Sequence, residues 1–116
     1  MRVDDASCRL AVYGTLAPGR KNHWVLEGLK GTWLAGTVRG HLHPEGWGAR
    51  EGYPALVHDK SGPEVTVQVF VSSELPKHWA RIDEFEGSQY RRTLVPVVLS
   101  SGKSVQCAIY ELNRQR

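Results

Sequence analysis

The chain has 116 residues, a net charge of +3 and a sequence pI near 9.1, and 41% of its residues are hydrophobic. This length holds one domain with one core, spanning 1–116, in which we expect 1–7 and 113–116 to be frayed. No apolar run approaches the roughly 20 residues that cross a bilayer, and the first residues form no signal segment, so we predict a cytoplasmic protein without a membrane partner. The basic residues are scattered, which argues against nucleic-acid binding.

The first predicted strand starts at Cys8 or Arg9 and ends at Tyr13, directly before a loop closed by Pro18 and Gly19. A glycine at the start of this loop tolerates positive φ and lets another group approach the main chain. Successive N–H groups there would turn toward one point and form a nest for an anion or a polarised carbonyl. These N–H groups belong to Gly14, Thr15 and Leu16. The alternative is that the glycine only makes a turn.

The next predicted elements are a short helix, a strand and a long loop. Asn22 is a suitable cap for the helix. The strand covers Thr32–Val38 with a bulge expected at Gly36, and Arg39–Leu42 continues it. The glycine-rich stretch His43–Tyr53 is predicted to be a loop, long enough to have a function.

The second half of the chain has the clearer patterns. A turn is predicted at Asp59–Pro63 and a hairpin at Ser101–Gly102. A second helix is predicted to be capped by Ser72 or Ser73, and Pro96 indicates an edge position or a bulge in its strand. The predicted strands of this half are Ala55–His58, Glu64–Val71, Tyr90–Leu99 and Ser104–Leu112.

Together these elements make about six or seven strands and two short helices. The strands do not alternate with the helices, which argues against a doubly wound parallel sheet. The pattern favours an α+β fold, a small mixed β-barrel with the two helices packed outside.

One acidic residue of the second helix stands out on a helical wheel. At about 100° per residue, Glu86 falls at the centre of the apolar stripe, Asp83 at its border and Glu84 on the side facing water. The stripe consists of Leu75, Trp79, Ile82 and Phe85. Burial and the partly negative helix C-terminus both disfavour charge on an inward carboxylate, so its pKa should rise toward neutrality, as a general acid/base requires.

Two structural alternatives to a catalytic role apply to Glu86. Unwinding of the helix at Gly87 would turn the carboxylate outward, and an ion pair with Arg91 or Arg92 would make it purely structural.

Several short motifs, in order, resemble the γ-glutamylcyclotransferase-like family, which includes γ-glutamylamine cyclotransferases and plant avirulence-induced proteins. The resemblance spans about Leu10 to Tyr110. It is carried by Tyr13-Gly14-Thr15-Leu16, Gly52-Tyr53-Pro54-Ala55-Leu56-Val57, Phe85-Glu86-Gly87 and Tyr90-Arg91. It implies a compact barrel with flanking helices and makes Glu86 the catalytic acid/base.

The resemblance further implies a small γ-glutamyl amine, amide or dipeptide as substrate, whose α-amine attacks its own γ-carbonyl and releases 5-oxoproline. Main-chain groups of Gly14, Thr15 and Leu16 would hold the oxyanion or the α-carboxylate. Thr15 is often Ser in the family, which leaves the subfamily open. The tyrosines that match positions around the substrate are Tyr13, Tyr90 and Tyr110, and for Tyr110 ordinary core packing is the favoured alternative. We expect Trp47 and Tyr53 to shape the leaving-group end.

No cofactor and no metal are expected for this chemistry. His41 and His43 share a strand face without a third ligand, and Cys8 and Cys107 are predicted to be free thiols. A monomer or a weak homodimer is expected. The alternative function is a non-catalytic small-molecule-binding or stress-response domain of the same fold.

Overall fold

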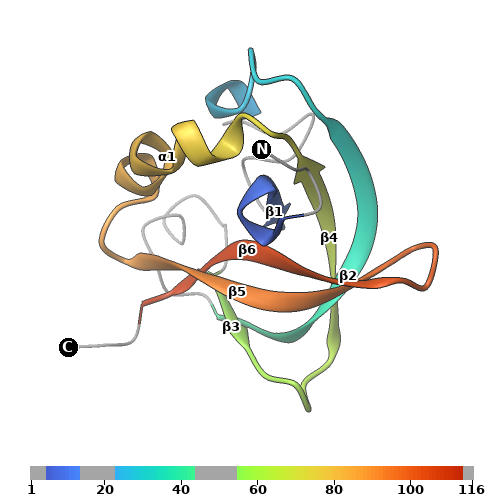
Figure 1. Ribbon diagram of the computed structural model, residues 1–116. Helices are drawn as coiled ribbons and strands as arrows, with labels where there is room; N and C mark the ends of the chain where they lie inside the picture. The colour runs from blue at the N-terminus through green and yellow to red at the C-terminus, as the bar shows by residue number, and fades with distance from the viewer. Residues whose placement is uncertain (1–4, 14–22, 44–54, 114–116) are drawn as a thin grey trace.

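The computed structural model describes residues 5–13, 23–43 and 55–113, which form six strands, one α-helix and three short 3-10 turns (Figure 1). Most of the strands lie where alternating or continuous apolar residues predict them. Gly14–Leu16, Asn22, Trp47 and Tyr53 lie outside the described residues. The strands are β1 (Arg9–Val12), β2 (Thr32–His43), β3 (Ala55–His58), β4 (Glu64–Val71), β5 (Tyr90–Leu99) and β6 (Ser104–Leu112).

Five of the strands close into a barrel. Their order is β1-β4-β2-β3-β6, and β6 pairs in parallel with β1 to complete the circle. The β3–β6 pairing is also parallel, whereas β4 is antiparallel to both β1 and β2. The sixth strand, β5, lies outside the circle along β6, and its pairing with β2 is limited to Gly36 and Thr37. The predicted α+β fold, a small mixed barrel, is confirmed.

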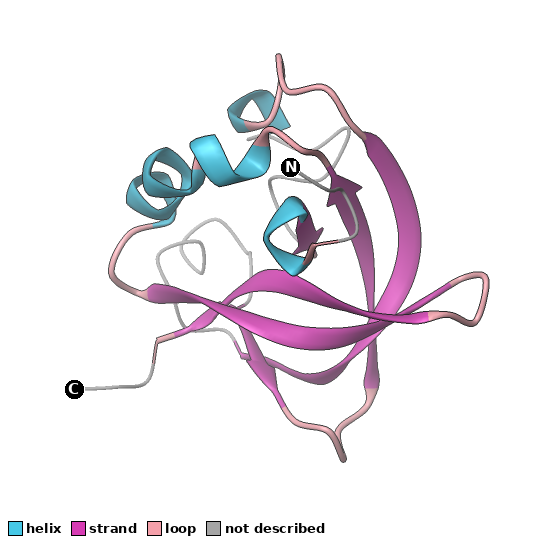
Figure 2. Cartoon of the chain, viewed as in Figure 1, coloured by secondary structure: helices cyan, strands magenta, loops and turns pink. Residues whose placement is uncertain are grey.

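The core has two layers, separated by the barrel wall. One layer fills the barrel and contains Val69 and Ile109, and the other lies between the barrel and the helical segments and contains Leu10 and Ile82. Successive residues of a strand point to opposite faces, so β6 contributes to both layers at once. Figure 2 shows the helical segments gathered on one side of the strands.

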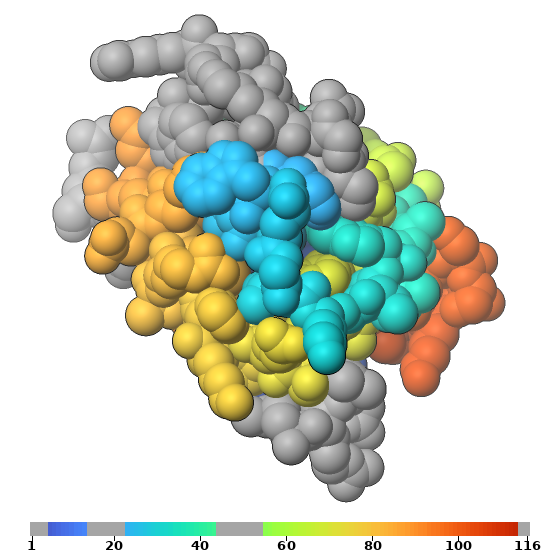
Figure 3. Space-filling view, turned by 90° about the horizontal axis from the view of Figure 1, so that it is seen from above, coloured from blue at the N-terminus to red at the C-terminus, as the bar shows by residue number. Residues whose placement is uncertain are grey.

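The helical segments are shorter than the sequence predicts. The second predicted helix is divided at His78 into a 3-10 turn, η4 (Leu75–Lys77), and an α-helix, α1 (Trp79–Glu86). The other turns are η1 (Ala6–Cys8) and η2 (His23–Val25), the latter in place of the first predicted helix. Figure 3 shows the segments around η2, η4 and α1 side by side on one face. None of the helices among the described residues is long and apolar enough to cross a membrane.

The bulge predicted at Gly36 is wrong. The β2–β4 register is unbroken from Thr32 opposite Val71 to Arg39 opposite Glu64. The glycine is needed instead for the close crossing of β5, because a Cβ on Gly36 would lie 2.9 Å from a main-chain carbonyl oxygen of that strand.

Two further predictions about strands concern their ends and edges. The first long strand, β2, continues through Arg39–Leu42 as predicted and ends at His43. Pro96 pairs with Gln106 of β6, where β5 has no second neighbour among the described strands, so the predicted edge position is confirmed.

Candidate active site

Glu86 is the last residue of α1 and faces inward. Its relative exposure is 9%, and it lies on the same buried side of the helix as Trp79 and Ile82. Gly87 ends the helix with φ +85°, and its N–H donates to the carbonyl of Asp83 at 3.0 Å. A residue with a Cβ rarely adopts this conformation, so glycine gives the helix an orderly stop here. The helix does not unwind before Glu86, and the carboxylate is not turned outward.

Burial raises the pKa of the Glu86 carboxyl to about 7. Neither a cation nor a hydrogen-bond donor is paired with this carboxylate in the described part of the chain. The ion pair that the sequence offered as an alternative is made elsewhere, because Arg92 binds Asp83. At neutral pH the Glu86 side chain is therefore present both with and without its proton, which suits a group that must accept and return one.

Asp83, one turn before Glu86, organises a network beside it. Arg92 donates through Nε to one oxygen of Asp83 at 3.0 Å and through Nη2 to the other at 3.2 Å. The Tyr110 hydroxyl donates to the first of these oxygens at 2.6 Å, and the Arg92 guanidinium stacks 4.4 Å above the Trp79 ring. These contacts fix α1 against β5 and β6, and with it the position of Glu86.

Tyr13 directly follows β1 and packs, half-buried, against the core layer that fills the barrel. Its hydroxyl donates to the main-chain oxygen of Tyr110 at 2.7 Å and accepts from the N–H of Leu56 at 2.9 Å. Burial raises the pKa of the Tyr13 hydroxyl, the bond from Leu56 opposes this, and the charges of Glu86 and Glu111 raise the pKa further.

Tyr90 and Tyr110 complete the part of the predicted site that the structure describes. Tyr90 begins β5 and packs, half-buried, against the layer between barrel and helices, and Tyr110 is buried in that layer. Burial is the main cause that raises the pKa of the Tyr110 hydroxyl. Its hydrogen bond to Asp83 and the Asp83 charge raise the pKa further, and the Glu86 charge acts in the same direction. Of the predicted site residues, Tyr90 and Tyr110 thus share the layer between barrel and helices, Glu86 lies on the side of α1 that faces this layer, and the Tyr13 hydroxyl is bound to Tyr110.

Glu111 is a buried carboxylate that the sequence analysis did not single out. It is 7% exposed and accepts from the His58 N–H at 2.7 Å and from the Thr93 hydroxyl. Period-two alternation would have found it, because Glu111 continues the inward positions of Cys107 and Ile109 on β6. A carboxylate at such a position needs partners from neighbouring strands.

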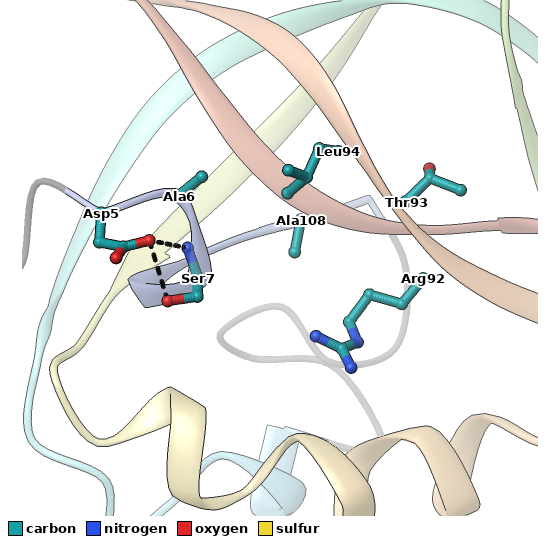
Figure 4. Close-up of a pocket in the computed structure, with 7 residues that line it drawn as sticks. All are labelled: Asp5, Ala6, Ser7, Arg92, Thr93, Leu94 and Ala108. Carbon is teal, nitrogen blue, oxygen red and sulfur yellow. Dashed lines mark hydrogen bonds between the residues drawn. The ribbon is translucent and has the colours of Figure 1, made fainter.

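A hollow of about 280 Å³ lies between η1 and the β5–β6 pair, and Glu86 is not among the residues that line it (Figure 4). Its Arg92 belongs to the network already described, and Asp5 at the other side is bound by Ser7 of its own turn. The hollow therefore adds no reactive group to the site.

The histidines and cysteines do not join the site. His41 pairs with Asp59 at 3.0 Å on the surface, and no group of three metal-binding side chains is present within 5–13, 23–43 and 55–113. Cys8 and Cys107 are buried free thiols, as predicted, and burial raises the pKa of Cys107 to about 11. A thiol that stays protonated is a poor nucleophile.

Comparison with known structures shows the same fold in several organisms. An uncharacterised protein from Pyrococcus horikoshii is 31% identical over 93% of this chain and 80% of its own, with a TM-score of 0.60. An AIG2-like protein from Mus musculus is 25% identical over 94% of this chain and 79% of its own, with a TM-score of 0.69. YkqA from Bacillus subtilis is also 25% identical, over 91% of this chain, with a TM-score of 0.69, but this chain spans only 36% of its length.

None of the curated proteins compared with this chain matches it. The family profile described as "Gamma-glutamyl cyclotransferase, AIG2-like" matches residues 10–116, which include Glu86 and all the tyrosines of the site. The chain belongs to this family.

Proposed function

We propose that this protein releases 5-oxoproline from a small γ-glutamyl amine, amide or dipeptide. The observation that carries the proposal is Glu86, a buried carboxyl with a pKa of about 7 and no partner in the described structure, in a chain of the γ-glutamyl cyclotransferase, AIG2-like family. A group with this pKa transfers protons in both directions near neutral pH.

The proposed reaction is an intramolecular aminolysis. The Glu86 carboxylate takes a proton from the α-ammonium group, and the free amine attacks the γ-carbonyl carbon to form a five-membered ring. The tetrahedral intermediate then collapses and the bond from the γ-carbon to the leaving nitrogen breaks. Glu86 returns its proton to that nitrogen, and the second proton of the ring nitrogen is lost to water, so that 5-oxoproline keeps one N–H. Because the attacking amine belongs to the substrate itself, the substrate already supplies much of the proximity. Glu86 would contribute about 10²–10⁴ in rate.

The oxyanion of the intermediate or the substrate α-carboxylate would be held by main-chain N–H groups. We assign this role to Gly14, Thr15 and Leu16, which follow Tyr13 directly. One such donor is typically worth about 2.7–4 kcal/mol of transition-state stabilisation. Tyr90 and Tyr110 would contact the glutamyl group with their rings.

The test measures 5-oxoproline release by the wild type and by Glu86→Gln from γ-glutamyl dipeptides, glutathione, γ-glutamyl-lysine and simple γ-glutamyl amines. We expect release by the wild type from at least one compound and a loss of at least 100-fold, the lower end of the range for a general acid/base, in the variant. Glu84→Gln changes an exposed glutamate of the same helix and is the matched control. Release that persists in Glu86→Gln would refute the mechanism, and binding without release would favour a domain that only binds small molecules.

A further inference from the structure

The junction between β3 and β6 in the barrel has little regular sheet structure. Only one pair of residues, Leu56 and Glu111, is in register across it. The N–H of Leu56 donates to the Tyr13 hydroxyl at 2.9 Å, and the N–H of His58 donates to the Glu111 carboxylate at 2.7 Å. Side chains thus satisfy two main-chain donors that a longer strand pairing would satisfy with carbonyl groups.

Glu111 is also bound to β5, the neighbour of β6 on its other side. The Thr93 hydroxyl of β5 donates to its second oxygen, so one buried carboxylate joins β3, β5 and β6. Burying a carboxylate is unfavourable unless hydrogen bonds offset the lost hydration. A hydrophobic residue in this place would avoid the cost of burying a carboxylate, but it would leave the His58 N–H and the Thr93 hydroxyl without this acceptor.

The contacts lead directly to the candidate active site. The Tyr13 hydroxyl, which binds Leu56, donates its one proton to the main-chain oxygen of Tyr110, the residue before Glu111. The same Tyr110 reaches Asp83 on α1 with its side chain. With its proton committed, the Tyr13 hydroxyl has none to donate to a substrate.

We propose that Glu111 is a positioning residue for the reaction: by holding His58 and Thr93 it sets the place of β3, and through Leu56 it fixes Tyr13 at the end of β1. This inference rests on the proposed function for its kinetic consequences but not for its structural ones. Tyr13, which family resemblance places at the substrate, becomes part of the support of the site rather than a donor to the ligand.

The variants are Glu111→Ala, Glu111→Gln and Val97→Ala. Glutamine keeps an oxygen for the His58 N–H and offers an amide N–H to the Thr93 hydroxyl, so it should retain the arrangement. Val97 on β5 is fully buried, packs in the same core layer as Val69 and Ile109, and makes none of these bonds, so Val97→Ala controls for lost stability alone. All assays are run well below the melting temperature of the least stable variant.

Kinetics and spectra are read together. We expect Glu111→Ala to lower kcat about 10- to 100-fold with a small change in KM, because misplaced groups act on the transition state. Glu111→Gln should stay within about threefold of the wild type in kcat, and Val97→Ala should leave kcat unchanged.

The double variant Tyr13→Phe/Glu111→Ala should show a smaller fold-loss in kcat than the product of the two single fold-losses, because both side chains hold β3. The NMR signals of the Tyr13 and Tyr110 rings should move in Glu111→Ala and stay in Val97→Ala.

The outcomes separate this inference from the proposed function. A wild type that releases no 5-oxoproline would refute the proposed function, and the ring signals would then decide the positioning role alone. Ring signals that do not move in Glu111→Ala, or equal kcat for Glu111→Ala and Val97→Ala, would overturn the positioning role. A raised KM in both Glu111→Ala and Glu111→Gln would also overturn it, because that pattern indicates direct contact of the charge with the substrate.

Discussion

Glu86→Gln should make the protein more stable at alkaline pH, even though we expect it to abolish activity. The pKa of Glu86 is about 7 in the folded protein against a model value of 4.5, and burial is the cause. An acid with a higher pKa in the folded state holds its proton more tightly there, so its contribution to the free energy of unfolding is complete below pH 4.5. This contribution is lost as the pH rises through about 7. A neutral glutamine of the same shape does not titrate, so the variant keeps this contribution to the free energy of unfolding at every pH.

The size of the effect follows from the two pKa values. Each pH unit between them is worth about 1.4 kcal/mol, so the free energy of unfolding of Glu86→Gln should exceed that of the wild type by about 3 kcal/mol at pH 8. The difference should be about 2 kcal/mol at pH 6 and close to zero at pH 4. Because the side chain is only 9% exposed, little of this is lost to solvent screening. At pH 8 the melting temperature should rise by about 10 °C.

The assay is urea denaturation of both proteins at pH 4, 6 and 8. Titration of all other groups cancels in the difference between variant and wild type. Glu84→Gln, the exposed control on the same helix, should differ little from the wild type at any of these pH values. A difference for Glu86→Gln that is the same at pH 4 and pH 8 would refute the claim that burial raises this pKa, and with it the physical basis of the proposed general acid/base.

Four further predictions concern the Glu86 carboxylate, the Asp83 ion pair, the strand crossing at Gly36 and the two buried thiols. The kcat/KM of the wild type should rise with pH through an apparent pKa of about 7, measured with a neutral leaving group, because Glu86 must be ionised to accept the ammonium proton. Asp83→Asn should lower the free energy of unfolding by about 1 kcal/mol in thermal melts, since its ion pair is partly exposed. Gly36→Ala should cost about 1–3 kcal/mol, because the new Cβ would meet a main-chain oxygen, and an unchanged melting temperature would contradict the crossing described above. Cys8 and Cys107 should react with a thiol reagent only after denaturation, and rapid labelling of the native protein would contradict their burial.

The strands were predictable because each follows a local rule. The alternate valines of Glu64–Val71 face the barrel interior. Phe70, an apolar residue on the opposite face of this strand, is buried in the layer between the barrel and the helical segments. The ranges Tyr90–Leu99 and Ser104–Leu112 agree with β5 and β6 in full. A turn signal between two such runs leaves few alternatives for their pairing.

The errors arose where distant parts of the chain decide the local structure. The close approach of β5 explains why position 36 is a glycine, and no residue near Gly36 in the sequence predicts this approach. The second predicted helix divides at His78, and neither Ser72 nor Ser73 caps it as predicted. Ser72 does accept from the Glu74 N–H, but Glu74 itself holds the cap position of η4, where no side chain makes a capping hydrogen bond. The inward position of Glu86 was predictable, since it depends only on helical periodicity and a glycine stop.

The two buried glutamates show why the site needs tertiary information. Both Glu86 and Glu111 are less than a tenth exposed, and both influence the Tyr13 hydroxyl. Glu111 accepts hydrogen bonds from two other strands. Glu86 lies on the apolar, buried side of α1 and has no hydrogen-bond partner among the described residues. A carboxylate with both oxygens occupied is suited to hold structure, and one without donors is suited to exchange a proton. Sequence periodicity places each of them inside, but only the donors around it assign its role.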